Sequence, residues 1–376
     1  MLLNFAEVLS QIGDGAAVRV ANSARPPANY LFNTFLPERM QPDYSVEAAT
    51  MIVRTTMAGL VAMDSPYPPG GTLEIGTFLE NSAKIGVANT LTEGALRQIQ
   101  SLLREMMLNG TGGSEFLVGE ALNFLNKVII QALLDTDEWL RGQALVYGLI
   151  NWTFNKKNLY VDYGIPTANK LPTRTDANND SYSDSASAFW TDVRAAQTAL
   201  RYDVRAAIMN SATFNKIVNN SVNAIQLISQ SLNGFTVRRY TTVGGNTVLS
   251  NDTRDGMTFI IYDEEAEVLD TSPAASFGTT QRLKYMPDGK ILFVGGSAGN
   301  RYRVGLGSTD DPRNDLELGY HAICPTVENS GKMGRWARLY VPQGYPMQLR
   351  GEGVENSLPV IYSPQRIVIA TTEMLP

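Results

Sequence analysis

Apolar residues in the first half of the chain recur at helical spacing. Between residues 96 and 106 they fall at intervals of three and four, at Leu96, Ile99, Leu102, Leu103 and Met106. This is the period of one face of an α-helix. Thr90 and Glu93 have capping-box spacing, which predicts a helix start there. The glycine-rich run at 109–113 predicts its end.

A second and longer helical pattern begins near Ser114 and continues to about Tyr147. Its apolar side is marked by Leu117, Ala121, Phe124, Leu125, Val128, Ala132 and Trp139. At 1.5 Å per residue the pattern predicts a rod of roughly 50 Å, which is long for a compact enzyme core. We interpret it as a structural spine, and its aromatic residues as packing groups rather than as a ligand box.

The segments before these helices follow a different pattern. Residues 1–44 show no sustained period and are rich in small, polar and proline residues, which indicates an extended arm. Between 45 and 88, β-like runs at 50–56, 72–77 and 84–87 flank the turn sequence at 66–71. That composition is typical of a long hairpin with a solvent-facing tip. Such a hairpin has little core of its own.

The second half of the chain predicts an α+β domain. A strand pair at 151–162 precedes a polar stretch that reaches residue 187. A helix at 189–200, a β run at 205–209, a short helix at 212–219 and mixed β segments up to residue 370 follow.

Composition and charge exclude several classes of function. The net charge is −6, and no basic run would follow a phosphate backbone. We therefore expect only weak, non-specific contact with DNA. The start of the chain lacks the basic region of a signal peptide. We expect no span that is long and apolar enough for a membrane-spanning helix. One cysteine, Cys324, excludes an internal disulfide framework.

The candidate chemical groups are few. His321 and Cys324 lie three residues apart, but a structural zinc site needs four ligands and a nucleophile needs an oriented base. The acidic residues at 263–265, 267 and 310–311 lack EF-hand spacing. The glycines at 110–113 and 295–299 lack the phosphate-loop ending. We expect no catalytic residue, no metal and no cofactor.

Four phrases, in this order along the chain, carry a resemblance to a known family. They are Tyr163-Gly164-Ile165-Pro166, the run from Ala188 to Phe214, Leu283 to Val294, and Leu358 to Ala370. Together they resemble the lambda-type (E-family) major capsid proteins of tailed bacteriophages. In that family the second phrase is a helix, a buried strand and a Ser-capped helix, and the third is a hairpin. The helix at 92–107 and the glycine-rich segment at 295–299 depart from the family pattern.

The resemblance implies the Hong Kong ninety-seven type capsid fold, with four parts. These are an N-terminal arm (1–44), an E-loop (45–89), a peripheral domain with the spine helix (90–187 plus about 335–352) and an axial domain (188–334 plus about 353–376). Some relatives in the wider fold join subunits through a Lys–Asn isopeptide bond. Lys84 is the candidate lysine, although the lambda-type branch is not built that way.

The expected function is that of a structural subunit, not an enzyme. The chain would assemble through hexamers and pentamers into an icosahedral head around double-stranded DNA. Scaffold, portal and decoration proteins would be its partners, and assembly would occur in the host bacterial cytoplasm. An encapsulin-like compartment shell is the alternative. A hydrolase is a third hypothesis, disfavoured by the lone histidine. The interface candidates are Tyr67, Pro68, Pro69, Leu73, Ile75, Phe78, Tyr30 and Phe32.

Overall fold

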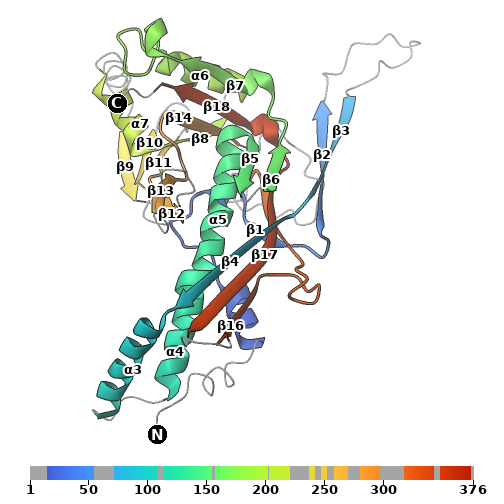
Figure 1. Ribbon diagram of the computed structural model, residues 1–376. Coiled ribbons are helices and arrows are strands. Elements are labelled where there is room, and N and C mark those ends of the chain that lie inside the picture. The colour runs from blue at the N-terminus through green and yellow to red at the C-terminus, as the bar shows by residue number, and fades with distance from the viewer. Residues whose placement is uncertain are drawn as a thin grey trace, which may run out of the picture.

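A computed structural model gives the arrangement of the chain. It describes residues 15–54, 72–108, 114–154, 157–201, 203–220, 237–241, 247–251, 258–269, 280–296, 317–342 and 348–373. The described part is an elongated body with one long helix along its axis, and the β2–β3 hairpin stands away from that body (Figure 1).

The spine predicted from residue 114 to residue 147 is one continuous helix. It consists of α4 (Ser114–Phe124), the π-helical turn η1 (Leu125–Ile130), α5 (Gln131–Gly142) and a second π-helical turn, η2 (Gln143–Tyr147). Gly148 ends it with φ of 69°, where a side chain would collide with Ile165. The two π-helical turns have no counterpart in the predicted pattern, because they change the hydrogen-bond register without changing which residues are apolar.

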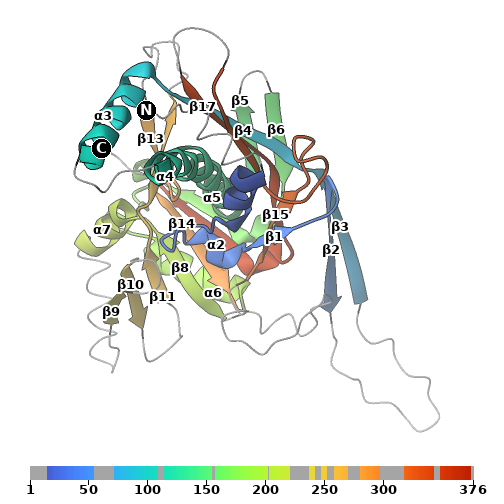
Figure 2. The same ribbon diagram turned by 90° about the horizontal axis from the view of Figure 1, so that it is seen from below.

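A five-stranded sheet lies against the spine. Its strands are β1 (Glu38–Met40), β15 (Gly319–Cys324), β17 (Leu349–Ile361), β16 (Trp336–Tyr340) and β4 (Ala83–Leu91). β17 is central, because it pairs with β16, β4 and β15 along its 13 residues. Gly351 and Gly353 bring it close to the helix: a Cβ on either would lie under 3.0 Å from Ile129 in η1. Figure 2 shows the spine end-on beside these strands.

A seven-stranded sheet forms the other large layer. Its order is β7 (Lys170–Arg174), β18 (Ile367–Thr372), β14 (Lys290–Gly295), β8 (Val204–Met209), β11 (Thr258–Ile261), β10 (Thr247–Asn251) and β9 (Val237–Thr241). Ala206 and Ile208 belong to the core on the spine side, whereas Ala207 and Met209 pack with α6 (Phe189–Ala199). Because successive side chains of a strand point to opposite faces, both faces of β8 are buried.

The remaining elements are small. Two-stranded sheets are formed by β2 (Ser45–Arg54) with β3 (Thr72–Asn81), by β5 (Leu149–Phe154) with β6 (Lys157–Asp162), and by β12 (Glu265–Leu269) with β13 (Thr280–Lys284). The other helices are α2 (Phe32–Phe35), α3 (Glu93–Leu108), α7 (Ser211–Asn219) and the 3-10 turns η3 (Thr167–Asn169), η4 (Asp176–Asn178) and η7 (Pro364–Arg366).

Three local expectations were wrong. Thr90 does not cap α3: it belongs to β4, where it pairs with Arg350 of β17, and the carbonyl of Thr92 accepts the first helical bond from the Leu96 amide. The phrase at 283–294 is not a hairpin, since β13 pairs with β12 and β14 pairs with β8 and β18. Asn210, rather than a serine, caps α7, and its side chain accepts a bond from the Thr213 amide. In the first two cases, pairing with strands distant in the sequence determined the structure.

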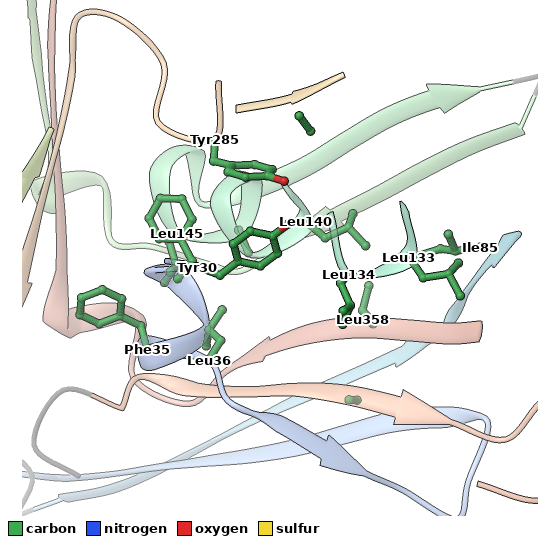
Figure 3. Close-up of a cluster of buried hydrophobic side chains, with 14 of the residues drawn as sticks. Tyr30, Phe35, Leu36, Ile85, Leu133, Leu134, Leu140, Leu145, Tyr285 and Leu358 are labelled. Atoms are coloured by element: carbon green, nitrogen blue, oxygen red, sulfur yellow. The ribbon is translucent and has the colours of Figure 1, made fainter. Parts of the chain in front are cut away.

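The N-terminal segment is less extended than its composition indicates. Residues 15–23 are helical, and α2 follows at Phe32–Phe35. Phe32, Phe35 and Leu36 are fully buried against the chain's own core. Figure 3 shows Phe35 and Leu36 beside Tyr30 and the spine residues Leu140 and Leu145. This part of the segment therefore has a core within one subunit.

One helix, Phe116–Tyr147, is long and apolar enough to cross a membrane by length and composition alone. The expectation that no span reaches that length and apolarity was therefore wrong. In the fold, however, the apolar side chains of this helix form the core, and its Asp137, Glu138 and Arg141 are completely buried among protein partners. This burial is typical of the central helix of a globular protein.

Candidate functional site

The β2–β3 hairpin is the element that the sequence marks for contact with other subunits. Within the described residues its two strands form ladder bonds only with each other. At its base, the amide and the hydroxyl of Ser82 both donate to the carbonyl of Tyr44, at 3.1 and 2.8 Å. Lys84 forms an ion pair with Glu328 beside them. The hairpin is therefore tied to the body at its base and projects from it (Figure 1).

Four exposed apolar side chains lie on the segments next to this base. Met40 is 50% exposed, Tyr44 49%, Val327 76% and Met333 47%. The segments that carry them are in contact, because the Gln41 amide donates to the carbonyl of Ile323, at 2.9 Å, just before the 325–334 loop. We call Met40, Tyr44, Val327 and Met333 the root patch. Exposed apolar groups gathered in one place are typical of a surface that another protein covers.

A cluster of charged groups lies beneath this region, between the spine and the five-stranded sheet. Arg335 is its centre. The guanidinium contacts carboxylates on three different elements: Asp137 on α5 at 2.7 Å, Glu355 on β17 at 2.6 Å and Glu38 on β1 at 2.5 Å. One side chain therefore joins the N-terminal strand, the spine and the sheet. We call these residues, with Glu138, Arg141, His321 and Ser357, the charge cluster.

His321 and Ser357 complete the surroundings of Asp137. The Nε2 atom of His321 lies 2.8 Å from Oδ1 of Asp137, and the Ser357 hydroxyl donates to the same oxygen at 2.9 Å. The arrangement is not a catalytic triad, because the serine bonds to the carboxylate and not to the imidazole. All three side chains are fully buried, so they are closed to a substrate.

Glu138 and Arg141 form the second half of the cluster. One oxygen of Glu138 accepts bonds from the Phe32 amide at 2.7 Å and from the Tyr262 hydroxyl at 2.8 Å. Its other oxygen faces Arg141 at 3.3 Å. Burial raises the pKa of Glu138 above its ordinary value, although Arg141 acts against this shift. The pair therefore anchors α2 to the spine.

Burial and neighbouring charges together set the pKa values of Asp137, Glu355 and Arg335. Burial would raise the pKa of Asp137, but His321, Arg335 and Arg141 hold that pKa far below its ordinary value. Burial, together with the charge of Asp137, raises the pKa of Glu355 well above its ordinary value. Burial would lower the pKa of Arg335, but Glu355, Asp137 and Glu38 keep it well above its ordinary value. Within the cluster, the attraction between opposite charges therefore offsets the cost of burying each of them.

A smaller polar cluster orders the long loop that follows β7. Arg174 contacts Asp192 on α6 and, at 3.2 Å, Asp180 in the loop. The Tyr182 hydroxyl donates to the same Asp192 at 2.8 Å. These bonds attach the polar stretch at 175–188 to the seven-stranded sheet. Their role is structural.

The interface candidates from the sequence fall in three places. Tyr67, Pro68 and Pro69 lie outside the described residues. Leu73, Ile75 and Phe78 lie in β3 of the hairpin. Tyr30 and Phe32 are 7% and 0% exposed and pack edge-to-face against Tyr285 and Tyr262, so they lie inside their own subunit.

The candidate chemical groups are dispersed. His321 faces Asp137, whereas Cys324 lies near Ser82, and burial raises the pKa of its thiol. Among the described residues no three potential ligands converge on a metal position. Asp263 accepts a bond from the Ser211 amide at the start of α7, and Glu265 pairs with Arg282. Residues 310–311 and 110–113 lie outside the described part.

The sequence reasoning did not identify the charge cluster. Asp137, Glu138 and Arg141 stand in a helical run rich in apolar residues, and this was a usable signal, because charged residues are rarely buried without partners. The partners themselves come from β1, β15, β17 and the segment before β16. Their convergence depends on strand pairing that local patterns do not specify.

The chain was compared with known proteins. The family described as "Phage major capsid protein E" matches residues 18–372. A prophage protein from Escherichia coli CFT073, described as a capsid protein, is similar in structure with a TM-score of 0.54 and 12% identity, over 99% of this chain and 100% of that one. A phage-related protein from Bordetella bronchiseptica RB50 gives a TM-score of 0.47 and 9% identity, over 95% and 96%. No curated protein matches the sequence significantly.

These findings agree with the fold described above. The spine helix, the sheet packed on it, the projecting hairpin and the separate seven-stranded sheet are the parts expected of the Hong Kong ninety-seven type capsid fold. The family match covers both large sheets and the hairpin. The resemblance seen in the sequence is confirmed: the chain belongs to the phage major capsid protein E family.

Proposed function

We propose that this capsid protein assembles through pentamers and hexamers of identical subunits into an icosahedral head that encloses phage DNA. The observation that carries the proposal is the family match over residues 18–372, together with a hairpin that finds no strand partner within the described part of its own subunit. Repeated contacts between copies of one chain close into rings and then into a shell.

We infer that the hairpin and the root patch form contacts between subunits. The root patch surrounds the point where the hairpin leaves the body, so one neighbouring copy can cover both. Burying these four exposed apolar side chains would stabilise that contact through the hydrophobic effect. The occupant we propose is a second copy of this chain, because the family is one of structural capsid subunits.

We also propose that this protein has several partners in the head. A scaffold protein would guide assembly in the host cytoplasm, a portal would occupy one vertex, and a decoration protein would bind outside. Packaged DNA would meet the shell weakly, because the chain carries a net charge of −6. An encapsulin-like compartment is the weaker alternative, since the matching family is that of phage heads.

The test compares two exposed valines. Val327 in the root patch is 76% exposed, and Val218 on α7 is 37% exposed and lies outside the patch. We expect Val327→Asp to leave the subunit folded but to reduce closed particles at least about tenfold, because a carboxylate must be desolvated in the contact. Val218→Asp should assemble normally. Electron microscopy and sedimentation count the particles, and circular dichroism checks folding.

Wild-type particle yield from Val327→Asp would contradict the root patch as a contact between copies. Failure of the unmodified chain to form particles, even when it is co-expressed with its scaffold, would contradict the proposed function itself.

A further inference from the structure

Strand β1 is held by its backbone, which pairs with β15, and by the Glu38 side chain, which contacts the charge cluster. His321 takes part in both. The backbone of β1 pairs in parallel with β15, where Glu38 is opposite His321. The His321 amide donates to the carbonyl of Pro37, and the Gln41 amide donates to that of Ile323, each at 2.9 Å. The side chain of Glu38 contacts Arg335 in the charge cluster. His321 is therefore both the ladder partner of β1 and a member of the cluster that holds it.

The contact with Asp137 decides which nitrogen of the neutral His321 ring carries the hydrogen. An ionised Asp137 can only accept bonds, so the Nε2 atom that faces it carries the hydrogen. The Nδ1 atom is buried and has no hydrogen-bond partner among the residues that the structure describes. In the neutral ring, Nδ1 has only a lone pair. Protonation would place a charged N–H there without an acceptor, in a cluster that already contains two guanidinium groups.

Charged and polar groups face this imidazole from every packed element. Asp137 contacts the imidazole directly, and Glu38 on β1 and Arg141 on α5 act on it through their charges. Glu138 on α5, Arg335 before β16, and Glu355 and Ser357 on β17 complete the network around Asp137, Arg141 and Glu38. We propose that the charge cluster is an acid-sensitive latch, in which protonation of His321 releases strand β1 from the spine and the five-stranded sheet. The inference concerns one subunit and does not depend on how subunits assemble.

The direction of the effect follows from linkage. Burial lowers the pKa of His321, whose ordinary value is about 6.5. The stability from a neutral His321 is therefore present above about pH 6.5 and is lost as the pH falls through the lower folded value. Histidine is the side chain suited to this range, and the chain has only this one.

Two carboxyl groups act in the opposite direction. The pKa values of Glu138 and Glu355 are raised in the folded protein. They contribute stability at low pH that is lost as the pH rises through those raised values. Asp137, with its lowered pKa, loses stability only in stronger acid. Between about pH 5 and 7, His321 is thus the one member of the cluster that weakens the latch on acidification.

The experiment measures hydrogen exchange at the Gln41 amide, which the ladder with β15 protects. Wild type and His321→Gln are compared at pH 7.5 and 5.5, after correction for the intrinsic exchange rate. The Nε2 of glutamine can still donate to Asp137 but does not titrate in this range. We expect protection of Gln41 in wild type to fall on acidification, because proton uptake by His321 then favours the open state. In His321→Gln it should stay constant or rise.

A control and a second measurement keep the result unambiguous. Amides of β14, in the seven-stranded sheet, should not respond to pH in either protein. An equal acid response at Gln41 in both proteins overturns the latch, and so does an unchanged wild type. If His321→Gln does not fold, an NMR titration of the single imidazole in the wild-type protein replaces it. Protonation of the imidazole should then coincide with the loss of protection at Gln41. An imidazole that stays neutral while β1 opens overturns the proposal.

Discussion

The two large sheets of this protein are buried by different chemistry. In the seven-stranded sheet, β8, β14 and β18 bury apolar side chains on both faces. Where the five-stranded sheet meets the spine, Asp137, Glu138, Arg141, His321 and Glu355 are each fully buried. The stability of an apolar layer depends on the total volume of its side chains and tolerates small changes in their packing. A buried charge cluster depends on every partner and on pH. The first region is therefore a stable platform, and the second is a junction that can be released.

Removing Arg335 is the strongest test of this contrast. Arg335→Met leaves Glu38, Asp137 and Glu355 without their shared cation, which should lower the free energy of unfolding by about 3–5 kcal/mol. Urea unfolding measures it. The control is Arg338→Met, whose partner Glu352 is on the surface side of the same sheet and which should cost at most about 1 kcal/mol. Equal costs for the two arginines would remove the distinction between the regions.

A smaller effect is expected where β17 approaches the spine. In Gly353→Ala the new methyl group would lie 2.6 Å from Ile129, so the helix must shift at a cost of about 1–3 kcal/mol. Gly86→Ala is the matched control, because its nearest neighbour would lie at 3.7 Å. Thermal unfolding of both variants checks this. A stable Gly353→Ala would mean that the contact between helix and sheet is looser than described.

The smallest expected effect is in the seven-stranded sheet. Ile208→Val removes one methylene group from a fully buried site and should cost about 0.5–1.5 kcal/mol. Because the residues opposite Ile208 on the two neighbouring strands, Leu292 and Ile260, are apolar, the loss should be the same at pH 5.5 and pH 7.5. Unfolding curves at the two pH values measure it. A loss that changes with pH would show that the apolar layer is coupled to the charge cluster.

Local patterns predicted the elements that depend on local periodicity. The spine begins at Ser114 and ends at Tyr147 as expected. The strand pair predicted at 151–162 spans 149–162, and helices α6 and α7 fall within one residue of their predicted bounds. The N-terminus of α3 was misplaced because β4 continues to Leu91 in order to pair with β17. The charge cluster was missed for the same reason: its members come from three distant parts of the chain, near residues 38, 140 and 321–357, and meet only after strands have paired.

The connection between the hairpin and β4 has a mechanical consequence. β3 ends at Asn81 and β4 begins at Ala83, and β4 then forms a ladder with β17 over nine positions, from Ala83 to Leu91. Tension on the hairpin along this strand direction loads those bonds in shear, so they share the force instead of breaking one after another. A pull on the projecting hairpin would thus be transmitted through β17 to the spine as a nearly rigid displacement.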